Sequence, residues 1–411
     1  MKLFLSQTFL RIILIKFFFC EKSLIQYFAK VRMKNRKKAI VCVSNDLITD
    51  NRVAKTCLVL EHQNYEVLLV GRKKRNSPKM NPRNYAWKRF KLPFEKGPFF
   101  YLTLNLRLLL FLLGRKVDLI YANDLDTLAP CYIVSKIKNT RLIYDTHELF
   151  TEVPELTSRP KIQHIWLKIE STIFPRLKQV ITVNDSIAKI YMQKYNVAVT
   201  TVRNVPVYDK EKISRNTRKE FNLRDEDFIL IIQGSGLNKD RGIEEAVSSM
   251  QYCTDCVLLL VGDGDVIPKA KKMVAEQKME SKVRFIPRRP YKELMKITRL
   301  ADLGLLLDKN TSLNQGLALP NKLFDYIHAG IPILSAELTE ITKIIKQYEV
   351  GIFLSEIEPK IICETILKYK SNIALQKQHR INCRNAAEQE NWQIEQQKLI
   401  NVIRSSEQNE A

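Results

Sequence analysis

A lysine and an aspartate at the start of one short helix are the residues whose spacing most directly suggests chemistry. They belong to the string QGLALPNKLFDYIHAGIPIL at residues 315–334. Pro320 is favourable at the start of a helix, and Gly330 is typical of a helix end. Lys322 and Asp325 lie three residues apart, so we expect them on one face of this helix, opposite its apolar residues.

This arrangement would suit a sugar nucleotide. The free N–H groups at a helix N-terminus bind anions, and Lys322 would add a positive charge beside a bound diphosphate. One turn further on, the carboxylate of Asp325 could accept hydrogen bonds from the two neighbouring hydroxyls of a ribose. An ordinary helix with a solvated Lys–Asp pair would show the same residues, so the local pattern leaves both interpretations open.

The same string resembles the donor-binding motif of retaining GT-B glycosyltransferases of family 4 from bacteria, Pro-Asn-Lys-Leu-Phe-Glu-Tyr followed by Gly-Ile-Pro. The resemblance implies that loop amides and Lys322 hold the donor's diphosphate and that Asp325 binds its ribose. There are two departures: Asp325 is one methylene shorter than the usual glutamate, and Leu317 stands where many members have a sugar-binding acid. Recognition of the sugar therefore cannot be read from the usual pair of acids.

A glycine-rich turn with two basic residues follows an apolar run at 228–232. Such a turn before a helix can hold a phosphate through its backbone N–H groups. The resemblance places a basic residue of this turn on the diphosphate, where Arg241 matches best and Lys239 second. Together with the first motif, the expected donor-binding residues are Gly234, Lys239, Arg241, Gly262, Ala318, Leu319, Asn321, Lys322 and Asp325.

Polar residues also follow the apolar runs of the first half of the chain, where ligands bind in parallel α/β sheets. Capping of the next helix would explain the same residues. The string Asp-Thr-His-Glu after the run at 141–144 resembles a family segment whose histidine contacts the donor sugar or a nearby phosphate. By this resemblance His147 is catalytic, together with Arg241 and Lys322. The residues expected on the acceptor side are Asp46, Asp50, Arg52, Asp124 and Glu148.

We expect neither a metal nor a cofactor. Asp124 and Asp126 form a D-x-D string, the metal signature of a different glycosyltransferase fold, but it lies far in sequence from the expected diphosphate site. GT-B enzymes, which this chain resembles, generally need no bound metal, and the nucleotide sugar enters as a substrate. The eight cysteines are scattered, and the single C-x-x-C at 253–256 has no second pair with which to bind zinc.

Apolar runs alternate with helical patterns along the chain, which predicts an α/β fold with parallel sheets. The resemblance implies the GT-B form, in which two Rossmann-like domains face a central cleft and a C-terminal helix crosses back to the first domain. The expected segments are an N-terminal extension at 1–32, an acceptor-side domain at 33–206, a nucleotide-sugar-binding domain at 207–388, and the crossing helix with its tail at 389–411.

A formal net charge of +23 over 411 residues points to a polyanionic partner, unless it reflects only a lysine-biased genome. No nucleic-acid-binding module is recognisable, so we expect an anionic membrane surface and no nucleic acid. The apolar segment 99–113 is too short to span a bilayer and is either a core helix or one whose apolar face enters the membrane. Residues 1–20 are apolar and basic, and could be an amphipathic anchor or precede a true start at Met33.

The sequence therefore predicts a cytoplasmic enzyme, peripheral at the inner face of the membrane. It would move a sugar from a nucleotide-diphosphate sugar to a hydroxyl acceptor, with retention of configuration. The expected acceptor is a lipid-linked or surface polysaccharide precursor. Two alternatives stay open: a nucleotide-sugar 2-epimerase of the same fold, and a non-catalytic basic protein of the membrane surface.

Overall fold

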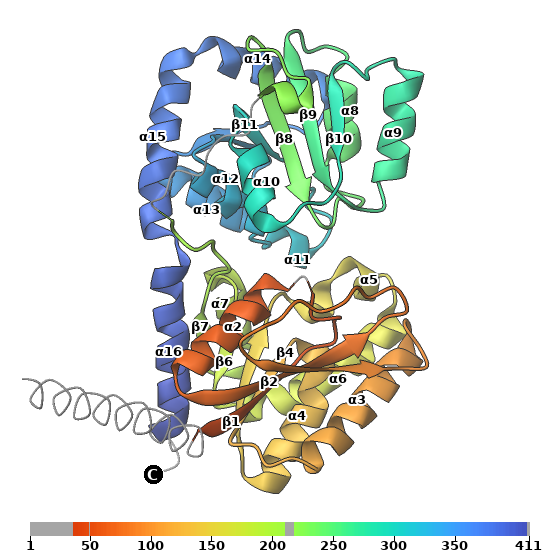
Figure 1. Cartoon of the computed structure of the whole chain (residues 1–411), viewed down its shortest axis with the longest axis vertical. Coiled ribbons are helices and arrows are strands. Elements are labelled where there is room, and N and C mark those ends of the chain that lie inside the picture. The colour runs from red at the N-terminus through yellow and green to blue at the C-terminus, as the bar shows by residue number, and fades with distance from the viewer. Residues whose placement is uncertain (1–35, 49, 210–217, 409–411) are drawn as a thin grey trace, which may run out of the picture. The chain divides into compact units, whose positions relative to one another are not determined.

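Two parallel β-sheets, each accompanied by helices, make up the fold (Figure 1). The computed structural model describes residues 36–48, 50–209 and 218–408, so the predictions for the N-terminal extension lie outside the described residues. Of the described residues, those up to Ala122 and Pro130–Leu142 form one compact unit, and Asn123–Ala129 with those from Ile143 onward form the other.

The first sheet has seven strands in the order β3-β2-β1-β4-β5-β6-β7. Its strands are β1 (Lys37–Cys42), β2 (Tyr65–Lys73), β3 (Ala86–Lys91), β4 (Leu119–Asn123), β5 (Arg141–Thr146), β6 (Val180–Thr182) and β7 (Val199–Thr201). The α-helices between them are α2 (Asn51–His62), α3 (Pro98–Leu113), α4 (Leu125–Lys138), α5 (Pro154–Thr157), α6 (Pro160–Ile173) and α7 (Asp185–Tyr195), with 3-10 turns η1 (Phe150–Glu152) and η2 (Phe174–Arg176).

The second sheet has six strands in the order β10-β9-β8-β11-β12-β13. Its strands are β8 (Phe228–Gly234), β9 (Cys256–Gly262), β10 (Val283–Ile286), β11 (Leu303–Leu306), β12 (Ile333–Ser335) and β13 (Gly351–Phe353). The turn η3 (Arg218–Phe221) precedes it, and its helices are α8 (Ile243–Ser249), α9 (Ile267–Glu276), α10 (Tyr291–Thr298), α11 (Leu313–Gly316), α12 (Asn321–Ala329), α13 (Thr339–Tyr348), α14 (Pro359–Ser371) and α15 (Ile373–Gln389).

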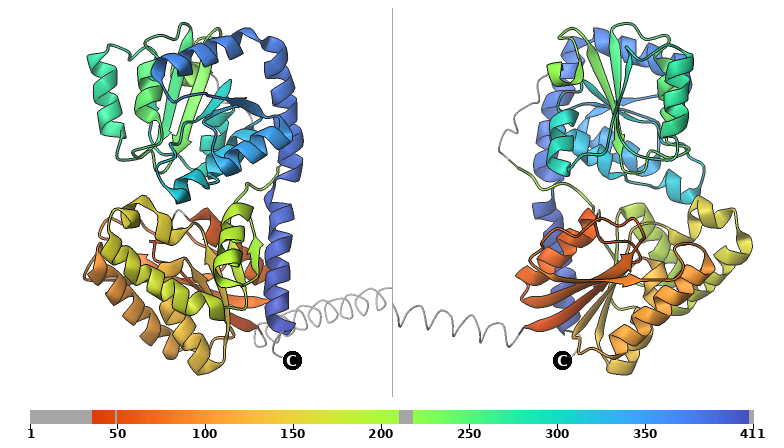
Figure 2. Two further views of the ribbon diagram at one scale, coloured as in Figure 1. Left: turned by 180° about the vertical axis from the view of Figure 1, so that it is seen from behind. Right: turned by 45° about the vertical axis from the view of Figure 1, so that its right-hand side comes forward.

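Helices cover both faces of the second sheet (Figure 2). The alternation of side chains along a strand explains this, because successive residues of β8 point to opposite faces. Ile229 and Ile231 belong to one buried apolar cluster. Leu230 and Ile232 belong to the other. A strand that is buried on both faces has a continuous apolar sequence, and β8 could therefore be predicted from its apolar run.

A helix at the C-terminus, α16 (Trp392–Gln408), packs against β7 of the first sheet. The backbone N–H of Trp392 donates to the carbonyl of Pro206 at 2.8 Å. The carboxylate of Glu395 accepts from the backbone N–H of Arg203 at 2.9 Å. The preceding helix α15 packs against α12 beside the second sheet. The predicted GT-B topology, with two parallel sheets and a returning C-terminal helix, is thus confirmed.

Candidate functional site

The glycine-rich turn that follows β8 requires glycine at its neighbouring strand end. Gly234 and Gly262 are paired at the ends of β8 and β9. A Cβ atom on Gly262 would lie 1.8 Å from the carbonyl oxygen of Gly234, and its φ of +133° disfavours other residues. Lys239, further along the turn, is exposed, and its backbone N–H donates to Asp265 at 3.0 Å. The backbone is therefore held closely, while the Lys239 side chain faces solvent.

Arg241 and Lys322 converge on one buried carboxylate that the sequence did not single out. Asp308 lies two residues after the end of β11, and only 4% of its side chain is exposed. Its Oδ1 lies 2.5 Å from Nη1 of Arg241, and its Oδ2 lies 2.9 Å from Nζ of Lys322. Burial alone would raise the pKa of Asp308, but the charges of Lys322 and Arg241 lower it below its ordinary value. The two predicted diphosphate ligands are thus brought together around a fixed anion.

The N-terminus of α12 has the features of an anion site. The helix covers Asn321–Ala329 and ends at Gly330 in the left-handed conformation, as its sequence predicts. Pro320 is the N-cap residue, and its side chain makes no hydrogen bond to the first turn. The backbone N–H groups at this helix end are therefore not capped by the N-cap side chain. The side chain of Asn321 accepts from Asn204 at 3.0 Å. Lys322 therefore extends from the first turn of a helix whose N-terminal N–H groups are not capped by the side chain of the N-cap residue.

Ala318 and Leu319 form the approach to this helix. The backbone N–H of Ala318 donates to the carbonyl of Gln315 at 3.2 Å, and Leu319 packs against the apolar cluster on that side of the sheet. The segment before Pro320 contains the short helix α11, which was not predicted from the sequence. Four residues are too few for a helical period to be recognised.

The carboxylate of Asp325 is turned into the protein. Only 9% of Asp325 is exposed. Its Oδ1 accepts from the hydroxyl of Tyr291 at 2.9 Å, and its Oδ2 accepts from Nε2 of Gln233 at 3.1 Å. Asp325 and Lys322 therefore do not form a solvated pair on a shared face, because each has a partner from another part of the sheet. Tyr291 is itself 41% exposed, so this end of the network is open to solvent.

His147 lies between two carboxylates. Its Nδ1 is 3.2 Å from Asp124 and its Nε2 is 3.7 Å from Asp145. The backbone N–H of His147 also donates to Asp124 at 2.9 Å. Burial would lower the pKa of this imidazole, but the two carboxylates outweigh it and raise the pKa well above its ordinary value. The two carboxylates therefore favour the protonated imidazole, and Asp124 fixes its orientation.

Glu148 is a second titratable group at the same strand end. Its Oε2 accepts from Nδ2 of Asn314 at 3.2 Å, while the Oδ1 of Asn314 accepts from the backbone N–H of Leu149 at 2.9 Å. Burial and the nearby charge of Asp124 raise the pKa of Glu148 from 4.5 to about 7. Asn314 is in α11, so this amide ties the segment after β5 to the segment before α12.

Comparisons with known proteins match both halves of the chain to glycosyltransferase families. Residues 50–206 match Glycosyltransferase Family 4, and residues 214–389 match Glycosyl transferases group 1. The chain belongs to glycosyltransferase family 4. It is therefore a glycosyltransferase, which supports the enzyme over the non-catalytic alternative. A search of curated proteins gave no significant match.

Solved structures share the fold of this glycosyltransferase at low sequence identity. Sucrose-phosphate synthase from Thermosynechococcus elongatus superposes with a TM-score of 0.74 at 15% identity, covering 90% of this chain and 99% of the other. A glycosyltransferase from Rickettsia africae gives 0.69 at 12%, covering 91% and 100%. HepE from Anabaena, in complex with UDP-glucose, gives 0.69 at 14%, covering 90% and 99%.

Three residues expected on the acceptor side of the glycosyltransferase lie in the segment after β1 and the start of α2. Asp50 is the N-cap of α2, accepting from the backbone N–H of Val53 at 3.0 Å. Asp46 accepts from the hydroxyl of Ser77 at 3.3 Å. Arg52 is buried, with 5% exposed. The helix begins at Asn51 because Asp50 caps it.

Four residues that contact the predicted site residues were not predicted from the sequence. Asp308 and Gln233 each stand where an apolar run ends, and a polar residue at a strand's carboxyl end was the available signal. Asn314 and Tyr291 carry no such signal, because their roles depend on partners 166 and 34 residues away. Within the described ranges, no group of three or more His, Cys, Asp or Glu residues could hold a metal ion.

The raised pKa of Glu148 predicts a pH-dependent stability for the glycosyltransferase. A carboxyl with a folded-state pKa above its unfolded value stabilises the fold while it is protonated, and that stability is lost as the pH rises through the folded value. The interval from 4.5 to about 7 corresponds to a loss on the order of 3 kcal/mol. Glu148→Gln, which keeps an oxygen for Asn314, should therefore be more stable than the parent at pH 8.

Chemical denaturation of both proteins at pH 5 and pH 8 measures this difference. At pH 5 the free energies of unfolding should differ by only about 1 kcal/mol, because Glu148 is still protonated in the folded state while its unfolded form has begun to ionise. An equal difference at the two pH values would show that Glu148 ionises at its ordinary pKa.

Proposed function

We propose that this enzyme transfers a sugar from a UDP-sugar to a hydroxyl acceptor and retains the configuration at the anomeric carbon. The observation that carries the proposal is the convergence of Arg241 and Lys322 beside the open N-terminus of α12. Two cations and a row of backbone N–H groups complement the charge and size of a diphosphate. Their nearness supports the role that the family motif gives to each residue separately.

Charge develops on the diphosphate as the bond between sugar and phosphate breaks. Arg241, Lys322 and the first-turn amides of α12 would stabilise that charge. Electrostatic stabilisation of this kind is usually the largest single contribution to the rate enhancement. The oxygen of the departing phosphate would accept the proton of the acceptor hydroxyl, so the new glycosidic bond forms on the face that the diphosphate leaves. His147, oriented by Asp124, would donate a hydrogen bond to the donor sugar.

The identity of the nucleotide is proposed from a structural neighbour. HepE from Anabaena was solved with UDP and with UDP-glucose. In our protein Asp325 stands where the family motif binds the ribose. Its carboxylate is held by Tyr291 and Gln233, so ribose binding would require a hydroxyl to join or replace the exposed Tyr291 partner. The acid that reads the sugar in many family members is absent at Leu317, so the sugar itself is not part of the proposal.

A thermal-shift panel of UDP, GDP, dTDP, CDP and ADP tests the nucleotide. A ligand that binds the folded state raises the melting temperature, and at equal concentration the ligand with the highest affinity raises it most. UDP should therefore give the largest increase. Incubation with UDP-sugars and candidate lipid-linked hydroxyl acceptors, followed by NMR of the product, then tests transfer and retention. Release of a free epimerised sugar in the absence of any acceptor would instead support the 2-epimerase.

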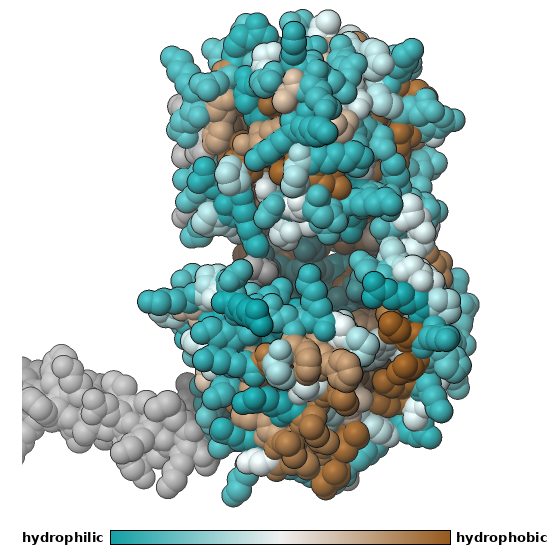
Figure 3. Space-filling view, turned by 90° about the vertical axis from the view of Figure 1, so that its right-hand side faces the viewer, coloured by the Kyte–Doolittle hydropathy of each residue, from teal (hydrophilic) through white to brown (hydrophobic). Residues whose placement is uncertain are grey.

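A membrane surface is the proposed location of the acceptor, and helix α3 supports it. Its residues Phe100, Leu104, Leu108 and Leu112 are buried in the core, yet the opposite side is also apolar. The side chains of Phe99, Leu102, Leu106 and Leu110 are each more than half exposed. Figure 3 shows an extended apolar patch in the lower half of the face it presents. Such a patch is typical of an interaction site.

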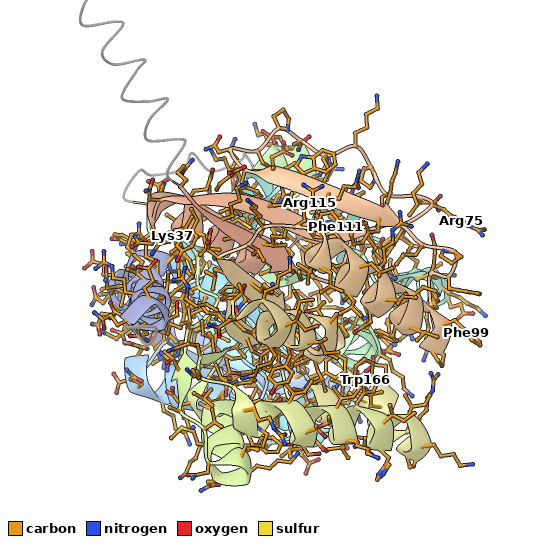
Figure 4. All side chains as sticks on the ribbon, turned by 90° about the horizontal axis from the view of Figure 1, so that it is seen from below. Lys37, Arg75, Phe99, Phe111, Arg115 and Trp166 are labelled. Atoms are coloured by element: carbon orange, nitrogen blue, oxygen red, sulfur yellow. The ribbon has the colours of Figure 1, made fainter. Side chains whose placement is uncertain are left out.

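The charges around α3 favour an anionic bilayer as the partner. The helix contains no acidic residue, and Arg107, Arg115 and Lys116 are exposed on it or directly after it. Arg115 stacks over Phe111 at 4.9 Å. In Figure 4 Phe99 marks one end of α3, with Arg75 on the same side, and Phe111 and Arg115 lie toward the other end. Among the described residues no helix is long and apolar enough to cross a membrane, so α3 would lie in the interface.

Sedimentation with vesicles tests this surface. Leu102→Glu/Leu110→Glu should lower binding to phosphatidylglycerol-containing vesicles by at least 10-fold, because two apolar side chains are lost and two negative charges are added. Both positions are exposed, so the core should keep its packing.

A matched control is Ile373→Glu/Ile381→Glu, which places the same charges on exposed apolar positions of α15. The control should bind vesicles like the parent. Equal loss of binding in both variants would mean that added negative charge alone is responsible and that α3 is not the contact.

A further inference from the structure

The buried carboxylate of Asp308 is the feature of the site that neither the family motif nor the proposed chemistry requires. Asp308 forms ion pairs with both Arg241 and Lys322. These cations come from the turn after β8 and the first turn of α12, so Asp308 joins two separate elements. Asp308 itself comes from a third segment, two residues after the end of β11, which lies between β8 and β12 in the sheet.

Asp308 changes the charge of the empty site. Without it, a guanidinium and an ammonium would stand close together in a region where Lys322 is 12% exposed and Asp308 is 4% exposed. With it, the three groups carry a net charge of about +1 rather than +2. Each cation uses one nitrogen on Asp308, and a guanidinium has five N–H donors while an ammonium has three. Donors therefore remain for an incoming anion, and the Arg241 side chain is 33% exposed to receive one.

We propose that Asp308 is an internal counter-anion that competes with the donor's diphosphate for Arg241 and Lys322, and so limits how tightly the released nucleoside diphosphate is held. The inference rests on the proposed function, because it takes these two cations as the diphosphate ligands. It assigns to Asp308 a regulatory effect on that site, with no direct contact to the sugar.

Electrostatics gives the direction and size of the effect. A carboxylate that stays beside both cations repels a diphosphate bound to the same cations. At about 5 Å and an effective dielectric constant of about 25 to 50, one unit charge changes an anion's binding constant by about 10- to 100-fold. The empty site is meanwhile spared the repulsion between its two cations. Asp308 thus allows the enzyme to keep two cations for the transition state without retaining its diphosphate product.

The test is the affinity of Asp308→Asn for charged ligands, measured by isothermal titration calorimetry. UDP and inorganic pyrophosphate should each bind at least 10-fold more tightly than to the parent, because the repelling charge is gone while both cations remain. Uridine, which carries no phosphate, should show no gain. If Asp308 only braced the two cations, the variant would bind UDP equally well or more weakly, which would overturn the proposal.

Asp302→Asn is a matched control in the same unit. Asp302 also lies between two arginines, 3.5 Å from Arg218 and 2.9 Å from Arg380, but it is not part of the predicted site. Its replacement should leave the affinities for UDP and pyrophosphate unchanged. A gain equal to that of Asp308→Asn would show that loss of any such carboxylate, and not the one beside the diphosphate ligands, tightens binding.

A second pair of variants covers the case in which Asp308→Asn fails to fold with two uncompensated cations. Arg241→Gln and the double variant Arg241→Gln/Asp308→Asn differ only in the carboxylate, and the double variant leaves a single cation. The double variant should bind pyrophosphate at least 10-fold more tightly than Arg241→Gln, and an equal or weaker affinity would overturn the proposal. If the parent itself binds neither UDP nor pyrophosphate, the proposed function fails; if the parent binds them and removal of Asp308 brings no gain, only this inference fails.

Discussion

Lys322→Ala should lower the rate of glycosyl transfer by about 10²–10³-fold while the enzyme stays folded. The ammonium lies at the open end of α12 and would stabilise charge on the departing diphosphate, and loss of one such donor has effects of this size. Stability should change little, because Asp308 keeps its 2.5 Å ion pair with Arg241. Turnover of the UDP-sugar at saturating donor, together with the melting temperature, measures both quantities. Arg241→Ala should have the same effect on rate.

Lys309→Ala is the control for this prediction. Lys309 follows Asp308 in the sequence and is also ion-paired, at 2.5 Å to Glu245, but it is not one of the predicted ligands. It should retain the parent's rate. Normal turnover in Lys322→Ala, with an unchanged melting temperature, would remove Lys322 from the catalytic site.

Local signals in the sequence were sufficient to predict the helix at the centre of the candidate site. The helix α12 begins after Pro320 and ends at Gly330 as predicted, because capping and helix termination are decided within a few residues. The buried strands of the second sheet were identified for a similar reason, since they are buried on both faces and read as continuous apolar runs. The GT-B topology followed from the family resemblance and is borne out by the fold.

Long-range pairing was not accessible from the sequence. Helical spacing predicted that Lys322 and Asp325 share a polar face. Asp325 is instead buried, and its carboxylate accepts a hydrogen bond from Gln233, which is 92 residues away. Asp308 was passed over because a lone acid after an apolar run gives no indication of which cations it meets. In the same way, Asp124 and His147 were each placed at a strand end, while their contact depends on how β4 and β5 are arranged.

Edge elements were missed for a different reason. The strand β3 reads Ala-Trp-Lys-Arg-Phe-Lys and is largely exposed, so it lacks the apolar run that marks a buried strand.

The helix α3 was predicted, but the sequence left open whether its apolar residues face the core or the membrane. The structure shows a buried face and an exposed apolar face on the same helix, which an almost wholly apolar sequence cannot distinguish.

His147→Ala should lower turnover by at least 10²-fold with less than a 3-fold change in the affinity for UDP. The imidazolium is oriented by Asp124, and positioned groups that donate a proton or a hydrogen bond in the transition state contribute rates of this order. Because UDP lacks the sugar that His147 is proposed to contact, the loss should appear in kcat and not in the binding of UDP. Rates are to be divided by the number of sites that UDP titrates, so that unfolded protein does not contribute.

Stability provides a second and independent readout for His147. Its pKa is raised in the folded state, so its contribution to stability is fully present below the unfolded value of about 6.5 and is lost as the pH rises through the raised pKa. The parent should accordingly exceed the variant in free energy of unfolding by the largest amount at low pH, and this difference should become smaller in alkaline solution. His164→Ala, an exposed histidine on α6, should change neither stability nor rate. A pH-independent difference would mean that His147 is not held as a cation, and unchanged turnover per UDP site would exclude it from the chemistry.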